Sequence, residues 1–218
     1  MSRGRAALDG LPPGYGISVY INCPFDKDYR QYFEAIIFTV VACGLEPKSA
    51  AIINVADTRI ERIASLLADC RFSIHDLSLL GVDSRTKVAR MNMPLELGIA
   101  MALHRMSKRQ RRMPQHDWTA LVRQDSSYKE AISDSNGNDL QRYGDRNELV
   151  SQVMNWFSDQ PDGTPIEFAP SDVVTVLATY DKELETLRPR WYDKLPWNQI
   201  VTAAKEIARR EQLLPPLA

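Results

Sequence analysis

Short β-branched runs alternate with helical stretches along most of this chain, and this alternation restricts its fold more than any other feature. A strand is expected over 17–22, and apolar residues at helical spacing follow over 28–43. A helix over 57–69 separates this pair from strands expected over 72–77 and 117–122. Because each crossover is long enough to join parallel strands, the sequence predicts a doubly wound α/β fold of the flavodoxin or Rossmann kind. Its parallel sheet is expected to hold about four to five strands, with a helical appendage at the C-terminus.

Further elements complete this pattern. An extended stretch is expected over 45–54, after Gly44 ends the preceding helix as its C′ residue. Pro94 is expected at the first position of another helix, and two more helices are expected over 128–134 and 146–158.

After residue 165 the pattern changes to helices alone, expected over 171–187 and 197–214. The chain is therefore expected to hold an α/β domain over 15–160 and a helical hairpin over 166–218. Large aromatic side chains bury much area when they dock, so three of them are expected to hold the hairpin against the α/β domain or a second subunit. They are Trp191, Tyr192 and Trp197.

The composition excludes several classes of protein. The chain has 218 residues, of which 44% are hydrophobic and 25% charged, so it can form a core and is neither disordered nor a disulfide-stapled miniprotein. Its net charge is −1, so neither nucleic acid nor an anionic membrane is expected as a partner. No apolar run approaches the roughly 20 residues that span a bilayer, and the expected location is the cytoplasm. The three cysteines lack CxxC spacing, so we expect free buried thiols, and neither a metal site nor a cofactor.

Polar residues follow the predicted strands at their carboxyl ends. The segment 22–26 (Asn-Cys-Pro-Phe-Asp) follows the first strand, His75 and Asp76 end the third, and 92–98 (Asn-Met-Pro-Leu-Glu-Leu-Gly) opens a helix. Because the carboxyl ends of parallel strands meet at one edge of a sheet, we expect these side chains to line one cleft.

These segments, together with Arg59-Ile-Glu61, resemble the bacterial branch of the nucleoside 2-deoxyribosyltransferase-like family, whose members are distant relatives of TIR domains. The resemblance covers about residues 15 to 160 and is most specific where Pro-Leu-Glu-Leu-Gly combines with the Pro-Phe after the first strand. It implies Glu96 as the catalytic carboxylate at C1′ of a ribose and Asp76 as a contact to the sugar or base. The substrate-binding residues that it implies are Asn22, Pro24, Phe25, Asp26, Arg59 and Asn92.

The chain departs from the transferases at two places. Asn22 and Cys23 stand where those proteins usually have a glycine before Pro-Phe, and Met93 and Pro94 stand where they usually have small residues. These departures favour a related N-glycosidic substrate such as NAD over free deoxynucleosides.

The chemistry of Glu96 can also be argued from the helix that carries it. With Pro94 at N1, Glu96 is expected at N3, where the helix dipole favours the ionised carboxylate. Such an anion suits an oxocarbenium-like transition state, as a nucleophile or as an electrostatic stabiliser. NAD already has a cationic leaving group, whereas a neutral base would also need an acid, for which Asp76 is the candidate. From spacing alone, an ordinary first-turn acid is the commoner explanation of Glu96, and the resemblance reverses this preference.

Each remaining candidate has a structural alternative. Asp26 could bind a ribose hydroxyl or hold a turn or helix N-cap, and Asn22 could contact a ligand or secure the loop after its strand. Arg59, in the first turn of its helix, needs a negative partner, either a substrate phosphate or, by slight preference, Glu61. Asn92 is expected to shape the entry to its helix rather than bind substrate.

Three other features have a structural interpretation of comparable or greater weight. His75 is expected in the core, because strand alternation points it away from Asp76. The basic run 105–112 is expected to be a solvated helix end rather than a nucleic-acid patch. The charged loop 78–91 is either a lid over the cleft or a connector, and its charged residues are Asp83, Arg85, Lys87 and Arg90.

The leading functional hypothesis is a nucleotide N-glycosidase that hydrolyses or transfers across the bond between a base and C1′, with NAD as the preferred substrate. Two alternatives come from other classes of protein: a nucleotide-binding sensor without turnover, and a TIR-like interaction module. The expected partner is a nucleotide or nucleoside, and assembly into a homo-oligomer is a further expectation.

Overall fold

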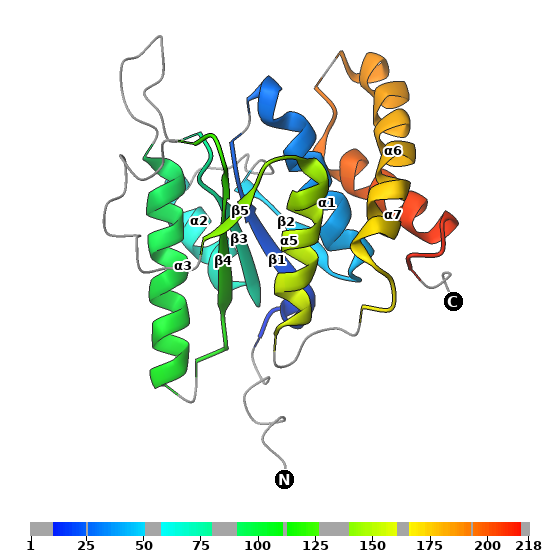
Figure 1. The fold of residues 1–218 in the computed structure, drawn as a ribbon. Coiled ribbons are helices and arrows are strands. Elements are labelled where there is room, and N and C mark those ends of the chain that lie inside the picture. Colours follow the sequence, from blue (N-terminus) through cyan, green and yellow to red (C-terminus); the bar gives the residue numbers. More distant parts are fainter. Residues whose placement is uncertain are drawn as a thin grey trace. The chain divides into compact units, whose positions relative to one another are not determined.

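The chain folds around a five-stranded parallel sheet with the strand order β2-β1-β3-β4-β5 (Figure 1). This order is the flavodoxin-like arrangement, so the expected α/β fold class is confirmed. The computed structural model describes residues 11–24, 26–50, 58–79, 91–110, 113–126, 140–160, 166–192 and 194–214. The strands are Ser18–Asn22 (β1), Glu46–Lys48 (β2), Phe72–Asp76 (β3), Asp117–Arg123 (β4) and Gln141–Tyr143 (β5).

Helices connect the strands and follow the last of them (Figure 1). The α-helices are Arg30–Ala42 (α1), Arg59–Ala68 (α2), Asn92–Arg109 (α3), Arg146–Ser158 (α5), Pro170–Leu187 (α6) and Trp197–Arg210 (α7). Short 3₁₀-helices are Tyr15–Ile17 (η1), Lys27–Tyr29 (η2) and Arg188–Trp191 (η5). No helix in these described ranges is long and apolar enough to cross a membrane.

Internal contacts divide the chain into two compact units. Unit 1 comprises residues 1–24 and 48–141, and unit 2 comprises residues 25–47 and 142–218. The C-terminal helices α6 and α7 therefore belong to the same unit as α1 and α5.

In unit 1, the central strands pair in parallel register. Asn22 of β1 lies opposite His75 of β3, and Asp76 lies opposite Leu121 of β4. Helix α3 packs against β3 and β4 and also against α2. Two apolar clusters support this layer, one around Leu77 and Leu97 and the other around Leu67.

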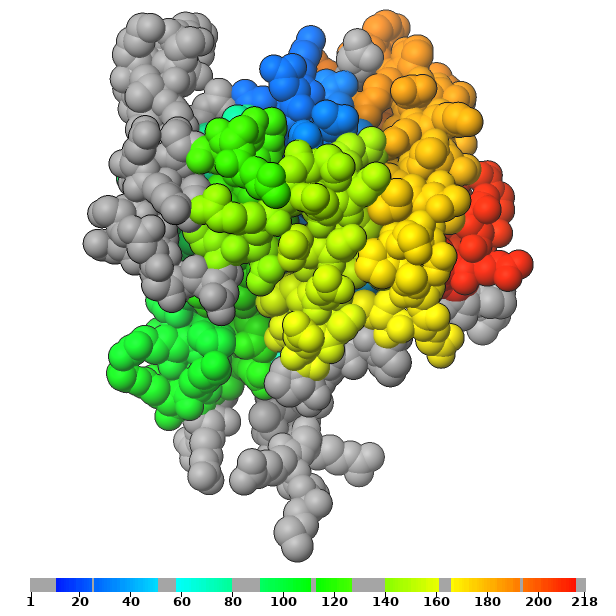
Figure 2. All heavy atoms as spheres, in the orientation of Figure 1, coloured from blue at the N-terminus to red at the C-terminus, as the bar shows by residue number. Residues whose placement is uncertain are grey.

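In unit 2, α1 is buried on all sides rather than on one face. Ten consecutive residues, from Phe33 to Ala42, are buried, where the sequence pattern predicts an amphipathic helix. The reason is that α5, α6 and α7 all contact α1. The ring of Phe38 stacks on that of Tyr180 with centroids 4.9 Å apart, and Phe33 lies 5.9 Å from Trp197. Figure 2 shows α5 and α6 side by side at the surface, in yellow-green and yellow-orange.

Local signals account for several helix ends. Gly44 follows α1 with a φ of +74°, as expected for a C′ glycine, because left-handed backbone is strained for other residues. Asp145 caps α5, since its Oδ1 accepts the backbone N–H groups of Asn147 and Glu148 at 2.8 and 2.9 Å. The residue at the N-cap of α2 is Thr58, and residue 57, where the sequence predicts the helix to start, lies outside the described residues.

One prediction about a helix start is wrong, and one about aromatic docking holds for Trp197 alone within the single chain. Helix α3 begins at Asn92 and not at Pro94, so it starts two residues earlier than the proline predicts. Of the aromatic residues expected to dock the C-terminal helices, Trp197 does contact α1, but Trp191 is 42% exposed and Tyr192 is 92% exposed. Tyr192 ends η5 in the left-handed conformation, with a φ of 48°, on the turn before α7. Docking of Trp191 and Tyr192 on a second subunit remains a prediction.

Several predicted features lie outside the described residues, and they remain predictions. These are the strand residues 51–54, the helix 128–134, Phe25, and residues 80–90 of the charged loop with Asp83, Arg85, Lys87 and Arg90.

Candidate functional site

The strand order predicts a ligand site at the carboxyl ends of β1 and β3. Connections from these neighbouring strands leave in opposite directions along the sheet, and open α/β sheets bind ligands where this occurs. Strand β1 ends at Asn22 and β3 ends at Asp76, and both residues are buried. Both belong to unit 1, as do Arg59, Asn92 and Glu96.

Glu96 is held by a tyrosine from the first strand. The hydroxyl of Tyr20 donates a hydrogen bond of 2.7 Å to Oε2 of Glu96, and the carboxylate residue is only 4% exposed. Burial raises the pKa of Glu96, while the Tyr20 hydrogen bond and the positive charge of Arg59 lower it. Burial and the neighbouring Glu96 carboxylate also raise the pKa of Tyr20, so this phenol remains a donor.

The predicted N3 position of Glu96 in its helix is wrong. Glu96 is the fifth residue of α3 and not N3, and no acidic residue lies in the first turn. The support for an ionised Glu96 comes instead from Arg59, the first residue of α2, and from Tyr20. The preferred partner of Arg59 was also predicted wrongly, because among the described residues no ion pair joins it to Glu61. That carboxylate instead accepts a hydrogen bond from the Thr58 hydroxyl at 2.5 Å.

Asp76 and Glu96 both raise the pKa of the Cys23 thiol. Cys23 is buried, and its thiol has a pKa raised first by burial and then by the charges of Asp76 and Glu96. Oδ1 of Asp76 accepts the backbone N–H of Ser78 at 2.8 Å, which secures the turn that leaves β3. Both predicted carboxylates therefore lie within electrostatic range of one sulfur atom, and that thiol is protonated and unreactive.

Asn22 links β1 to the start of α3. Its side-chain amide nitrogen donates to the carbonyl of Met93 at 3.1 Å and to Nδ1 of His75 at 3.0 Å. Because a backbone carbonyl can only accept, the first of these bonds determines which end of the amide is the nitrogen. These bonds secure the start of α3 and His75, and not the loop after β1 that the structural alternative for Asn22 named. A ligand contact of Asn22 remains a prediction.

A buried chain of hydrogen bonds continues from Asn22 through β3. Nε2 of His75 and Nε2 of His116 each lie 2.9 Å from Oγ of Ser73, and Nδ1 of His116 lies 2.9 Å from the carbonyl of Cys70. We name this set of Asn22, His75, Ser73 and His116 the buried amide–imidazole chain.

The two carbonyls at the ends of this chain determine every proton in it. Since Asn22 donates to Nδ1 of His75, the proton of His75 is on Nε2 and is donated to Ser73. Ser73 in turn donates to Nε2 of His116, whose Nδ1–H is donated to Cys70. Burial lowers the pKa of His75 to about 3 and that of His116 to about 4, so both rings are neutral at pH 7. The expectation that His75 is a satisfied core residue is confirmed.

The remaining predicted substrate contacts occupy different settings. Pro24 is buried two residues after Asn22, and Asn92 is an exposed residue at the start of α3. Asp26 occupies the N-cap position of η2 in unit 2, where its carbonyl accepts the N–H of Tyr29 at 3.1 Å and its side chain makes no cap hydrogen bond. Substrate contacts by Pro24, Asn92 and Asp26 remain predictions.

Outside this site, the described part of the basic run behaves as a helix end. Arg105, Lys108 and Arg109 are exposed on the last turns of α3, where cations complement the helix dipole. Within the described ranges, no group of three or more His, Cys, Asp or Glu side chains is arranged to hold a metal ion.

Comparisons with known proteins found no relative of this chain. No protein-family model, no curated protein and no solved structure matches it.

Proposed function

We propose that unit 1 is a nucleotide N-glycosidase that acts at C1′ of a ribosyl–base bond, with NAD as the preferred substrate. The observation that carries this proposal is the buried Glu96 carboxylate, oriented by the Tyr20 hydroxyl at 2.7 Å and near the charge of Arg59. It lies on the helix that Asn22 anchors to the end of β1, at the edge where this fold binds ligands.

The reaction requires a fixed negative charge near C1′. As the bond between C1′ and the nicotinamide nitrogen breaks, its electron pair leaves with the nicotinamide and positive charge develops on the ribose. An ionised Glu96 stabilises that charge or attacks C1′ directly, and water then completes hydrolysis with release of a proton. Because burial removes competing water, the carboxylate acts more strongly than it would in solvent.

Tyr20 and Arg59 have a positioning role in this scheme. Each lowers the pKa of Glu96 against the raising effect of burial, and so each increases the fraction of the carboxylate that is ionised. For a substrate with a neutral base, Asp76 is the proposed proton donor.

The decisive experiment compares Glu96→Gln with the wild-type protein on NAD and on a panel of nucleosides, with chromatography of the released base. The amide keeps the shape and can accept the Tyr20 hydrogen bond, so we expect base release to fall about 100- to 1,000-fold. The matched control is Glu61→Gln, which makes the same change at an exposed position on α2 and should leave release unaltered. Unchanged release in Glu96→Gln would remove Glu96 from the mechanism.

One observation favours a second function, nucleotide binding without turnover. The buried position of Glu96 and its raised pKa favour the neutral acid, which can donate a hydrogen bond to a ligand but cannot stabilise a cation. Saturable NAD binding by calorimetry, with no base released over a range of pH, would establish this sensor function and exclude the enzyme.

A further inference from the structure

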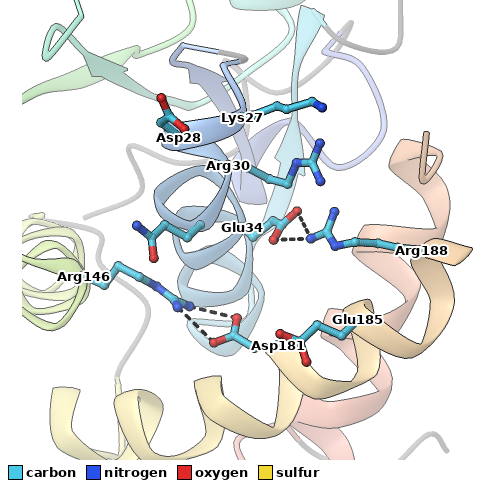
Figure 3. A pocket seen from close by; sticks show the side chains of 9 residues that line it. Lys27, Asp28, Arg30, Glu34, Arg146, Asp181, Glu185 and Arg188 are labelled. Carbon is cyan, nitrogen blue, oxygen red and sulfur yellow. Dashed lines mark hydrogen bonds and ion pairs between the residues drawn. The ribbon is translucent and has the colours of Figure 1, made fainter. Parts of the chain in front are cut away.

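Unit 2 contains a cleft of about 490 Å³ that shares no lining residue with the Glu96 site. It is lined by η2 and the start of α1, by the first residue of α5, by the last turns of α6, and by η5 (Figure 3). Four lining residues are cationic, four are carboxylates and one is a glutamine. No apolar side chain lines the cleft, so its complement is a polar ligand and not an aromatic base.

Two ion pairs form the fixed part of this cleft. Arg146 holds Asp181 through two parallel hydrogen bonds of 2.9 and 3.0 Å. Nη2 of Arg188 lies 2.6 Å from both carboxylate oxygens of Glu34, whose side chain is 7% exposed. Such charge-assisted bonds keep the side chains in one conformation, so the cleft is organised before any ligand arrives.

Two further cations, Lys27 and Arg30, line the cleft together with the ion pair of Arg188 and Glu34. Within the part of the chain that the structure describes, Lys27 and Arg30 form no ion pair, and Figure 3 shows their head groups directed to the same side of α1 as the guanidinium of Arg188. Arg188 uses a single nitrogen on Glu34, so its other donors are also available there. The cations Lys27, Arg30 and Arg188 therefore outnumber Glu34 beside this pair, while the lining as a whole has equal numbers of cations and carboxylates.

We propose that this cleft binds a phosphomonoester of the sugar phosphate class. A phosphate monoester carries about −1.5 to −2 charges at pH 7, which matches the excess of Lys27, Arg30 and Arg188 over Glu34. The carboxylates of Asp28 and Glu185 line the same cleft and accept hydrogen bonds from sugar hydroxyls. The volume suits a ligand of this size, since small-molecule pockets start at about 300 Å³.

Calorimetry of the full chain with three probes tests the proposal: ribose 5-phosphate, inorganic phosphate and ribose. Ribose 5-phosphate should bind at least about fivefold more tightly than inorganic phosphate, and ribose alone should give no saturable heat. Lys27→Gln combined with Arg30→Gln should weaken ribose 5-phosphate binding at least about 30-fold, because two charge-assisted contacts are lost. Equal affinity for the two phosphates would overturn the sugar phosphate assignment and indicate an adventitious ion only.

Two controls separate this cleft from the rest of the protein. Lys182→Gln combined with Arg190→Gln removes two exposed cations of unit 2 outside the cleft and should change the affinity less than about twofold. Glu96→Gln should leave ribose 5-phosphate binding intact, whatever it does to base release. Loss of binding in Glu96→Gln would place the ligand at the other site and overturn the proposal, as would an unaltered affinity in the Lys27 and Arg30 variant with a wild-type melting temperature.

Discussion

The two units hold their polar side chains in opposite ways. In unit 1, the buried amide–imidazole chain is neutral, and each of its hydrogen bonds has one direction. In unit 2, the cleft is built from ions, and two of its cations have no ion-pair partner among the described residues. A neutral chain with every proton assigned fixes geometry at little cost in charge desolvation, whereas an open cleft of ions supplies a field that attracts a ligand.

The neutral chain is suited to positioning a helix, and the ionic cleft is suited to attracting a ligand. The chain in unit 1 anchors α3 through Met93 and so positions the helix that carries Glu96. The cleft in unit 2 instead presents the charged side chains of Lys27 and Arg30 to a ligand. The two regions should therefore respond differently to substitution and to pH.

The largest effect is expected from Arg188→Met in unit 2. This change removes the cation that is hydrogen-bonded to the buried carboxylate of Glu34, which should cost about 3 kcal/mol in the free energy of unfolding. The loss should be larger at pH 8 than at pH 5. Arg188 lowers the pKa of Glu34, so its removal raises that pKa further, and a carboxyl with a raised folded-state pKa loses stability as pH rises.

Urea unfolding at the two pH values measures this effect. Adding Glu34→Gln to Arg188→Met should recover part of the loss, since no buried charge is then left unpaired. Arg190→Met is the matched control at an exposed position on the same 3₁₀-helix. An equal loss at pH 5 and pH 8 would contradict a buried ionised Glu34.

Ser73→Ala should have the next largest effect, in unit 1. The substitution leaves the Nε2–H of His75 and the Nε2 lone pair of His116 without their common partner, so we expect a loss of about 2 kcal/mol. Urea unfolding of Ser65→Ala, an exposed serine of α2, provides the comparison. A loss no greater than in that control would mean that the serine does not connect the two rings.

Protonation of the buried amide–imidazole chain provides a third test. The folded-state pKa values of about 3 and about 4 lie below the ordinary value of 6.5, so the unfolded state takes up protons first as pH falls. Each ring should therefore remove about 1.4 kcal/mol of stability per pH unit below that ordinary value. Glu34 and Glu96 act in the opposite direction, because burial raises the pKa of each.

Nitrogen-15 NMR of the imidazoles isolates the contribution of the rings. His75 should show the Nε2–H tautomer, His116 should show the Nδ1–H tautomer, and both should remain neutral at pH 5. Titration of either ring near pH 6.5 would contradict the assigned chain.

The smallest effect is expected from Tyr20→Phe. Because the Tyr20 hydrogen bond lowers the pKa of Glu96, its loss should raise that pKa and move the acid limb of base release to higher pH. Tyr15→Phe is a matched control, since Tyr15 donates to the carbonyl of Gln115 in the same unit and is not among the causes of the Glu96 shift. A pH profile that is the same in Tyr20→Phe and in the wild-type protein would exclude the positioning role of Tyr20.

Much of the fold could be predicted because it depends on local periodicity. The strands β1 and β3, the helices α1 and α2, and the glycine after α1 all follow from residue spacing within short windows. The start of α3 was predicted two residues late, because proline is tolerated anywhere in the first turn of a helix and does not mark a single position there.

The partners within the candidate site could not be predicted, because they depend on pairs far apart in the chain. Tyr20 and Glu96 are 76 residues apart, and Ser73 and His116 are 43 residues apart. Tyr20 carries no sequence signal beyond strand propensity, so only the register of β1 against β3 and the packing of α3 bring it to the carboxylate. The same limit applies to Arg59, because the sequence suggests a neighbour on its own helix, whereas its charge lowers the pKa of Glu96 on another helix.

If Asn22 contacts the ligand as predicted, its amide restricts which ligand groups it can bind. Both of its N–H bonds are already committed, one to the Met93 carbonyl and one to His75, so the oxygen is the atom that this side chain can still offer. Any group that hydrogen-bonds to Asn22 must therefore bring its own proton, as a sugar hydroxyl or an exocyclic amine does. A ligand group that can only accept a hydrogen bond, such as an ether or a keto oxygen, cannot bond to the amide oxygen of Asn22.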